Sequence, residues 1–276
     1  MRGKPRTLDE ESVLQSHNAF GADLGARGLV RTTPATRLFV LRELVLWASI
    51  YPLYLAIRGW SIADPELAHA DAWRVVRWER SLDLFHEVAL QKLLDPFEGF
   101  FSTYYMLGFG PVLASILVWL AGSRRRYYRE LRTLLFISLG MALVVYLAFP
   151  TAPPRLVPGL GIADTVGLSG HDTGSFAGVR FNPYAAMPSL HVGWSILAAT
   201  VLFRATSRTW LRTAAVLHPV LMTLAVTQTG NHYLADSLAG ALVALLALTA
   251  VGMWSRRPGH ATAASPAGVR ARQHAA

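Results

Sequence analysis

Two histidines stand at the start of long apolar runs, where a membrane helix would meet water. His191 ends the sequence Met-Pro-Ser-Leu-His at 187–191, and His232 lies in Asn-His-Tyr-Leu-Ala-Asp at 231–236. Ionisable groups at a membrane edge are costly and usually serve a function. Asp236 follows His232 by four residues, so on a helix its carboxylate shares a face with the ring. A carboxylate there can hold the proton of one ring nitrogen and leave the other nucleophilic, which predicts a catalytic pair of histidines.

Further residues near these motifs suit an anion. Ser189 can cap the helix that carries His191, and a helix N-terminus presents N–H groups and partial positive charge. Arg155, which ends Pro-Thr-Ala-Pro-Pro-Arg at 150–155, adds a planar cation that matches phosphate oxygens, although an arginine there could also snorkel to headgroups. Together these residues predict chemistry on a phosphate ester. The two histidines and the aspartate are suitable zinc ligands, but their spacing is not typical of zinc sites, and no metal or cofactor is predicted.

The elements that must position these residues are membrane helices. The chain has 276 residues, of which 53% are hydrophobic and 16% charged, so it is more apolar than a soluble domain. The apolar residues occur in blocks near the roughly 20 residues needed to cross a bilayer. We therefore predict an all-α integral membrane protein with six transmembrane helices. The expected spans are Leu38–Ile57, Thr103–Ala121, Leu131–Phe149, Pro188–Phe203, Leu211–Val226 and Tyr233–Trp254.

The distribution of charge predicts the topology. The net charge is +9, and the basic clusters fall in the tails and in the loops 122–130 and 204–210, whereas acids gather on the opposite side. This is the positive-inside pattern. It predicts a multi-pass protein of the cell membrane, with flexible cytoplasmic tails at 1–37 and 255–276 and a membrane domain at 38–254. Nucleic-acid binding is not needed to explain the charge, and the absence of cysteine excludes disulfides and thiolate metal sites.

Two long segments are expected on the extracytoplasmic side, where both histidine motifs would also lie. Within the first, 65–94 is predicted to form one or two amphipathic helices, with an apolar stripe formed by Leu67, Ala70, Trp73 and Val76. We expect this helix to lie in the membrane interface, and a lid or a lipid-entry surface is the alternative. The second segment, 150–187, is rich in proline and glycine and is predicted to be irregular and functional.

The two histidine motifs together resemble a known family. Pro-Ser-Leu-His at 188–191 and His-Tyr-Leu-Ala-Asp at 232–236 are similar to the second and third signature motifs of the type 2 phosphatidic acid phosphatase superfamily. The leucine before His191 and the run at 150–155 resemble its inositolphosphorylceramide-synthase-like branch. The resemblance extends from about the second to the sixth span. It implies a helical bundle like that of these phosphatases, with a phospholipid or lipid phosphate as substrate.

The resemblance also implies roles for the residues. His232 would attack phosphorus, Asp236 would hold its tautomer, and His191 would protonate the leaving oxygen and then activate the incoming water or alcohol. Arg155 and the helix start at Ser189 would stabilise the phosphoryl oxygens. The Ser-Arg pair that begins seven residues before the histidine in the phosphatase motif is replaced here by Ala-Val at 225–226. Arg180 and Asn182 are further candidates to complete the phosphate clamp.

The sequence leaves several alternatives open. A lipid phosphatase and an inositolphosphotransferase-like enzyme differ only in whether water or an alcohol accepts the group. A transporter with a histidine proton relay is a second class, and an inactive phosphatase-like scaffold is a third. Ionisable groups within the spans are nearly confined to Arg42, Glu43 and His218, which argues against a transporter. The lipid donor, the acceptor and the oligomeric state are not predicted.

Overall fold

The computed structural model describes residues 37–49, 64–168, 175–176, 179–180 and 184–255. The chain divides into two compact units, 1–54 and 55–276, which are described separately. In the first unit, residues 37–49 form a helix within the predicted first span. The rest of that span in 50–57, both predicted tails apart from Arg37 and Ser255, and Asn182 lie outside the described residues.

The described residues of the second unit lie mostly in helices, as predicted. The helices of the first half are α3 (Pro65–Ser81), α4 (Glu87–Leu94), η1 (Asp95–Phe97), α5 (Glu98–Gly108), α6 (Gly110–Ser123) and α7 (Arg125–Ala148). The second half contains η2 (Pro154–Leu156), α8 (Thr165–Leu168), α9 (Leu190–Ala205), α10 (Thr209–Gln228) and α11 (Leu234–Ser255). Two short antiparallel strands, β1 (Ser175–Phe176) and β2 (Val179–Arg180), form a small hairpin.

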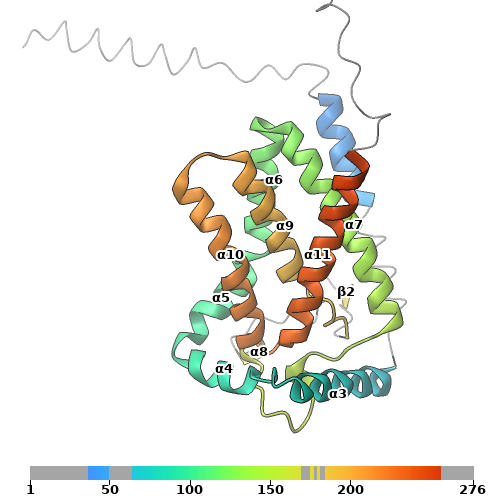
Figure 1. Ribbon diagram of the computed structural model, residues 1–276, viewed down its shortest axis with the longest axis vertical. Helices are drawn as coiled ribbons and strands as arrows, with labels where there is room; N and C mark the ends of the chain where they lie inside the picture. Colours follow the sequence, from blue (N-terminus) through green and yellow to red (C-terminus); the bar gives the residue numbers. More distant parts are fainter. Residues whose placement is uncertain (1–36, 50–63, 169–174, 177–178, 181–183, 256–276) are drawn as a thin grey trace, which may run out of the picture. The chain divides into compact units, whose positions relative to one another are not determined.

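Helix α9 lies at the centre of the bundle, packed against α7, α10 and α11, while α3 lies across one end (Figure 1). In the described residues, four helical runs are long and apolar enough to cross a membrane: Glu87–Ser123, Arg125–Ala148, Thr209–Gln228 and Leu234–Trp254. Leu190–Ala205 is apolar but shorter. These runs confirm a helical architecture suited to a membrane, and the count of six spans stays a prediction.

The second predicted span is interrupted. We expected one helix over 103–121, but α5 ends at Gly108 and α6 begins at Gly110. Between them, Phe109 has φ −88° and ψ −83°, outside the α-helical region. The local sequence Gly-Phe-Gly-Pro explains the break, because glycine weakens a helix and Pro111 cannot donate the N–H that an uninterrupted helix needs.

The buried face of α3 carries acids as well as apolar residues. Leu67 is 45% exposed and Ala70 is also exposed. The buried face instead carries Ala68, Asp71, Ala72, Val75, Val76 and Glu79. The predicted stripe shares Val76 with this buried face, which also contains two acids, and the placement of the stripe in the membrane interface stays a prediction. The core cluster on this face also contains Ala152, Met187 and Tyr233, so α3 packs against the segments that lead to the histidines.

In its described residues, the segment between α7 and α9 is mostly irregular, as expected. Its two ends meet, because Thr151 donates its N–H to the Tyr184 carbonyl at 2.9 Å and accepts the Ala186 N–H at 3.1 Å. A further backbone bond, from Ala152 to the Ala68 carbonyl at 3.1 Å, ties this junction to α3. The chain just before α9 is therefore held close to the start of α11.

Candidate active site

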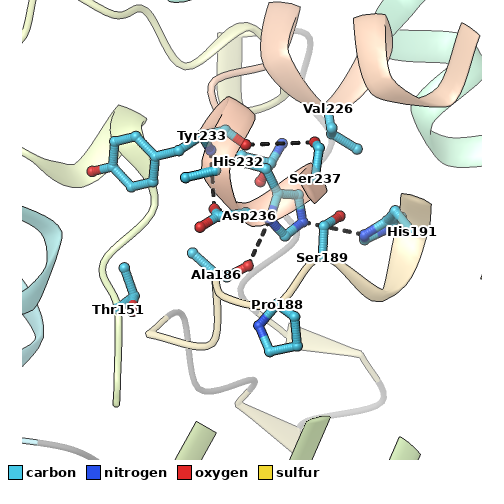
Figure 2. Close-up of polar contacts among 12 residues, drawn as sticks. Thr151, Ala186, Pro188, Ser189, His191, Val226, His232, Tyr233, Asp236 and Ser237 are labelled. Atoms are coloured by element: carbon cyan, nitrogen blue, oxygen red, sulfur yellow. Dashed lines mark hydrogen bonds and ion pairs between the residues drawn. The ribbon is translucent and has the colours of Figure 1, made fainter. Parts of the chain in front are cut away.

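His232 lies in the turn between α10 and α11. It directly precedes Tyr233, which stands at the N-cap position of α11. Its Nδ1 is 2.8 Å from the Ala186 carbonyl oxygen and 3.3 Å from Oδ2 of Asp236 (Figure 2). A carbonyl oxygen can only accept a hydrogen bond, so Nδ1 carries the proton and Nε2 of the neutral ring holds the lone pair. The ring is only 6% exposed. The predicted pairing with Asp236 is therefore present, although only the aspartate is within the helix.

Asp236 also caps the start of α11. Its Oδ2 accepts the backbone N–H of Tyr233 at 2.9 Å, as the third residue of a helix does in a capping box. The side chain is fully buried, and its Oδ1 has no hydrogen-bond partner among the described residues. One carboxylate thus fixes both the ring of His232 and the backbone that follows it.

His191 faces His232 from the first turn of α9. Its Nδ1 is 3.4 Å from Nε2 of His232, the nitrogen that holds the lone pair (Figure 2). Two aromatic rings hold His191: Tyr105 stacks on it with centroids 4.7 Å apart, and Phe109 is tilted against it at 4.2 Å. The helix break at Phe109 therefore lies directly beside the site. The two imidazole rings meet edge to face, with centroids 5.5 Å apart and planes at 60°, and one of them has a defined tautomer.

Ser189 caps α9 as predicted. The side chain is fully buried, and its Oγ accepts the Val192 N–H at 3.4 Å. Its own backbone N–H donates to the Asp236 carbonyl at 2.9 Å, which joins the first turns of α9 and α11. A Cβ added to Gly240 would overlap the Ser189 carbonyl oxygen, so the two helices meet here at backbone contact.

Arg155 lies beside the turn that precedes His232. Its Nε donates to Oδ1 of Asn231 at 3.0 Å, and its guanidinium is 3.6 Å from Oδ2 of Asp164. Its backbone N–H donates to the Gly230 carbonyl at 2.9 Å. Gly230 has φ +65°, a conformation that other residues rarely adopt. The side chain is only 14% exposed. Arg155 is therefore a largely buried cation that bonds to Asn231, the residue directly before His232.

The other two clamp candidates are placed less completely. Arg180 ends β2, and its backbone pairs with Ser175. Asn182 lies outside the described residues. The position of the arginine that the phosphatase motif carries is filled by Val226, whose side chain is fully buried with Val192 and Met222. Val226 still serves the site, because its carbonyl accepts the backbone N–H of His232 at 3.2 Å.

Sequence reasoning missed several residues that hold the site. Asn231 orients Arg155, and its Nδ2 donates to the Thr229 hydroxyl at 2.9 Å. Its place directly before His232 was the available signal. Glu79 and Glu87 bond to the start of α11, whereas in the sequence they count only among the acids on the side opposite the basic clusters. Within the described parts of the chain, no group of three or more histidine, cysteine or acidic side chains could hold a metal ion.

Comparison with known proteins identifies a family. A family model described as "PAP2 superfamily" matches residues 73–250, which include both histidine motifs. The comparison with curated proteins gives no match. Among solved structures, the chain is similar to the crystal structure of Aquifex aeolicus LpxE, with 18% identity and a TM-score of 0.45, over 61% of this chain and 94% of that one.

Proposed function

The chain belongs to the PAP2 superfamily, and from this premise we propose a membrane lipid phosphatase or phosphotransferase that acts through a phosphohistidine. The observation that carries the proposal is the arrangement of His232. One nitrogen of its ring is held by the Ala186 carbonyl and by Asp236, and the other faces His191 at 3.4 Å. That is the arrangement of an activated nucleophile beside an acid and base.

The proposed reaction has two steps. In the first, Nε2 of His232 forms a bond to phosphorus while the bond from phosphorus to the leaving oxygen breaks, and His191 gives that oxygen its proton. In the second, His191 takes a proton from water or an alcohol, whose oxygen displaces the phosphoryl group from Nε2. In-line displacement puts the leaving oxygen on the far side of phosphorus. The His191 ring must therefore swing away from His232 when substrate enters.

Two positive features are suited to the phosphoryl oxygens. The start of α9 at Ser189 supplies N–H groups and partial positive charge, and Arg155 supplies a guanidinium beside Asn231. We propose that both bind the phosphate, with Arg180 and Asn182 completing the clamp. The site is proposed to open on the extracytoplasmic face, where the headgroup of a membrane lipid would present its phosphate to the helix starts.

The acceptor separates the two versions of the proposal. Water gives a phosphatase, and an alcohol such as inositol gives the transferase that the Pro-Ser-Leu-His motif resembles. The superfamily favours an enzyme over the transporter alternative. A direct assay of turnover distinguishes an inactive scaffold from the phosphatase and from the transferase.

The test uses the full-length protein in lipid nanodiscs with a panel of lipid phosphates and phospholipids. We expect metal-independent turnover in wild type, seen either as released phosphate or as headgroup exchange onto added inositol. A phosphoryl group bound through nitrogen should be trapped on the protein as an acid-labile, alkali-stable adduct. His232→Ala should lose both turnover and adduct, while His86→Ala, at an exposed position before α4, serves as the control. Turnover that persists in His232→Ala would exclude the proposed nucleophile.

A further inference from the structure

Two buried carboxyl groups lie next to the site and take no part in the histidine pair. Glu79 in α3 is 1% exposed, and Glu87 at the start of α4 is 0% exposed. Burial of an ionised carboxylate is costly unless it is paired or hydrogen-bonded. The Oε1 atom of Glu79 accepts the backbone N–H of Ala235 at 2.6 Å, and that of Glu87 accepts the N–H of Leu234 at 2.8 Å. Both residues therefore bond to the first turn of α11.

The two carboxyl groups cannot both be ionised at neutral pH. Burial, and next the negative charge of Glu87, raises the pKa of Glu79 from its ordinary value of 4.5 to about 9. The other titratable groups that face Glu79 are Tyr233 and Asp236 at the start of α11, and Asp236 in turn contacts His232. Near neutral pH the pair therefore holds one proton and one negative charge. Both Oε2 atoms are buried and have no hydrogen-bond partner among the described residues, so a proton on one carboxyl group is the donor that the other lacks.

Resting on the proposed function, we propose that Glu79 and Glu87 are positioning residues of the reaction. As a pair with one shared proton, they fix the first turn of α11 and so place His232 against Ala186 and His191. The backbone N–H groups that they accept lie only two and three residues after His232. The third carboxyl group of this turn, Asp236, accepts the Tyr233 N–H.

The physical reason is that rigid positioning of a nucleophile carries much of its rate advantage, and an error of about 1 Å can cost about 100-fold. An unsupported first turn would leave several N–H groups buried without acceptors and would allow the turn to shift. The glutamates come from α3 and α4, so they also tie the nucleophile to the segment that lies across the end of the bundle (Figure 1). We expect their loss to reduce kcat and to leave KM largely unchanged.

The first experiment compares three variants in steady-state kinetics. Glu79→Ala removes the acceptor and should lower kcat about 10-fold or more, with KM within about threefold of wild type. Glu79→Gln keeps an acceptor oxygen, and its amide can donate to Glu87 as the shared proton does, so it should recover most of the lost kcat. Glu66→Ala, an exposed acid in the first turn of the same helix, is the matched control. An effect on KM alone, or a Gln variant as impaired as the Ala variant, would overturn the proposal.

The second experiment follows pH. As the pH rises through about 9, the wild-type pair should lose its proton and carry two repelling charges. The plot of kcat against pH should therefore show a falling alkaline limb near pH 9. Glu79→Gln cannot become doubly charged and should lack the limb. Stability should follow the same sign. Because folding raises the pKa of Glu79, its stabilisation is complete below about pH 4.5 and is lost progressively as the pH rises through about 9. The melting temperature of Glu79→Gln should be less sensitive to pH over this range.

A third measurement does not depend on turnover. The infrared carbonyl band of a protonated carboxyl should be present in wild type at neutral pH, disappear near pH 9, and be missing in Glu79→Gln. Absence of this band in wild type would refute the shared proton whatever the activity. If the band is present and no lipid phosphate is turned over, the proposed function fails, and the positioning role fails with it, while the carboxyl pair itself is established.

Discussion

The two helices that carry the candidate site begin in opposite electrostatic environments. Helix α9 begins at the neutral hydroxyl of Ser189. Helix α11 begins among three buried carboxyl groups, because Asp236, Glu87 and Glu79 accept the backbone N–H groups of 233–235. A phosphate is attracted to an uncompensated helix start and repelled by one already bonded to acids. The difference supports the proposal that α11 holds the nucleophile and that α9 is the start suited to the phosphate.

The largest effect should come from His191 at the α9 start. His191→Ala removes the proposed acid and should slow turnover of a lipid phosphate about 10²–10⁴-fold. A substrate with an activated leaving group, such as p-nitrophenyl phosphate, needs no proton and should be slowed much less in adduct formation. The two substrates can be compared in single-turnover assays. An equal loss for both would show that His191 does not protonate the leaving oxygen.

The next effect concerns the charge at the α11 start. Asp236→Asn keeps an oxygen for the Tyr233 N–H but removes the charge that holds the proton on Nδ1 of His232. A hydrogen bond to a charged group is worth about 1.5–3 kcal/mol, so adduct formation should slow about 10–150-fold. Quenched-flow measurement of the adduct gives this rate directly. A wild-type rate would mean that the Ala186 carbonyl alone orients the ring.

The contact that joins the two starts can be tested by adding one methyl group. In Gly240→Ala the new Cβ would overlap the Ser189 carbonyl oxygen, which should destabilise the protein by about 1–3 kcal/mol. Gly140→Ala in α7 is the control, because a Cβ there meets nothing within 4 Å. Thermal unfolding in nanodiscs should separate the two variants by several degrees, at about 2–4 °C per kcal/mol. Equal melting temperatures would show that the helices can separate without cost.

The smallest effect is expected at the cap of α9. Ser189→Ala removes the hydroxyl that accepts the Val192 N–H and should cost about 1 kcal/mol of stability. Ser115→Ala is the matched control, since that exposed hydroxyl only bonds back to the Pro111 carbonyl of its own helix. A comparison of melting temperatures tests the cap. If the two variants melt alike, the α9 start is held by its backbone bond to Asp236 instead.

The histidine pair was predictable because its signals are local. The spacing of His232 and Asp236 and the cap position of Ser189 before His191 can be read within six residues of chain. The family match confirms the superfamily that these motifs indicated, whereas the synthase-like branch stays a prediction. The third partner of His232, the Ala186 carbonyl, lies 46 residues away and is a backbone atom, so no residue type in the sequence predicts it.

The supporting acids could not be predicted from pattern. Glu79 and Glu87 bond to residues 156 and 147 positions later in the chain, and the sequence marks them only as acids on the side opposite the basic clusters. For the same reason, the acids on the buried face of α3, Asp71 and Glu79, were not part of its predicted apolar stripe. The break at Phe109 is a different case, because Gly-Phe-Gly-Pro was visible and was outweighed by the continuous hydropathy of 103–121.

The backbone contact between α9 and α11 limits how an enzyme of this design can diversify. A Cβ on Gly193 would lie 2.8 Å from the Gly240 carbonyl oxygen, so neither side of the contact has room for a larger residue. Few positions in the first turns of α9 and α11 can therefore be substituted, whether in evolution or by protein engineering. New donors and acceptors must be accommodated by surrounding segments, such as 150–187 and the aromatic residues beside His191. The proposed chemistry is therefore tied to first turns that tolerate little change, and variation is left to the residues around them.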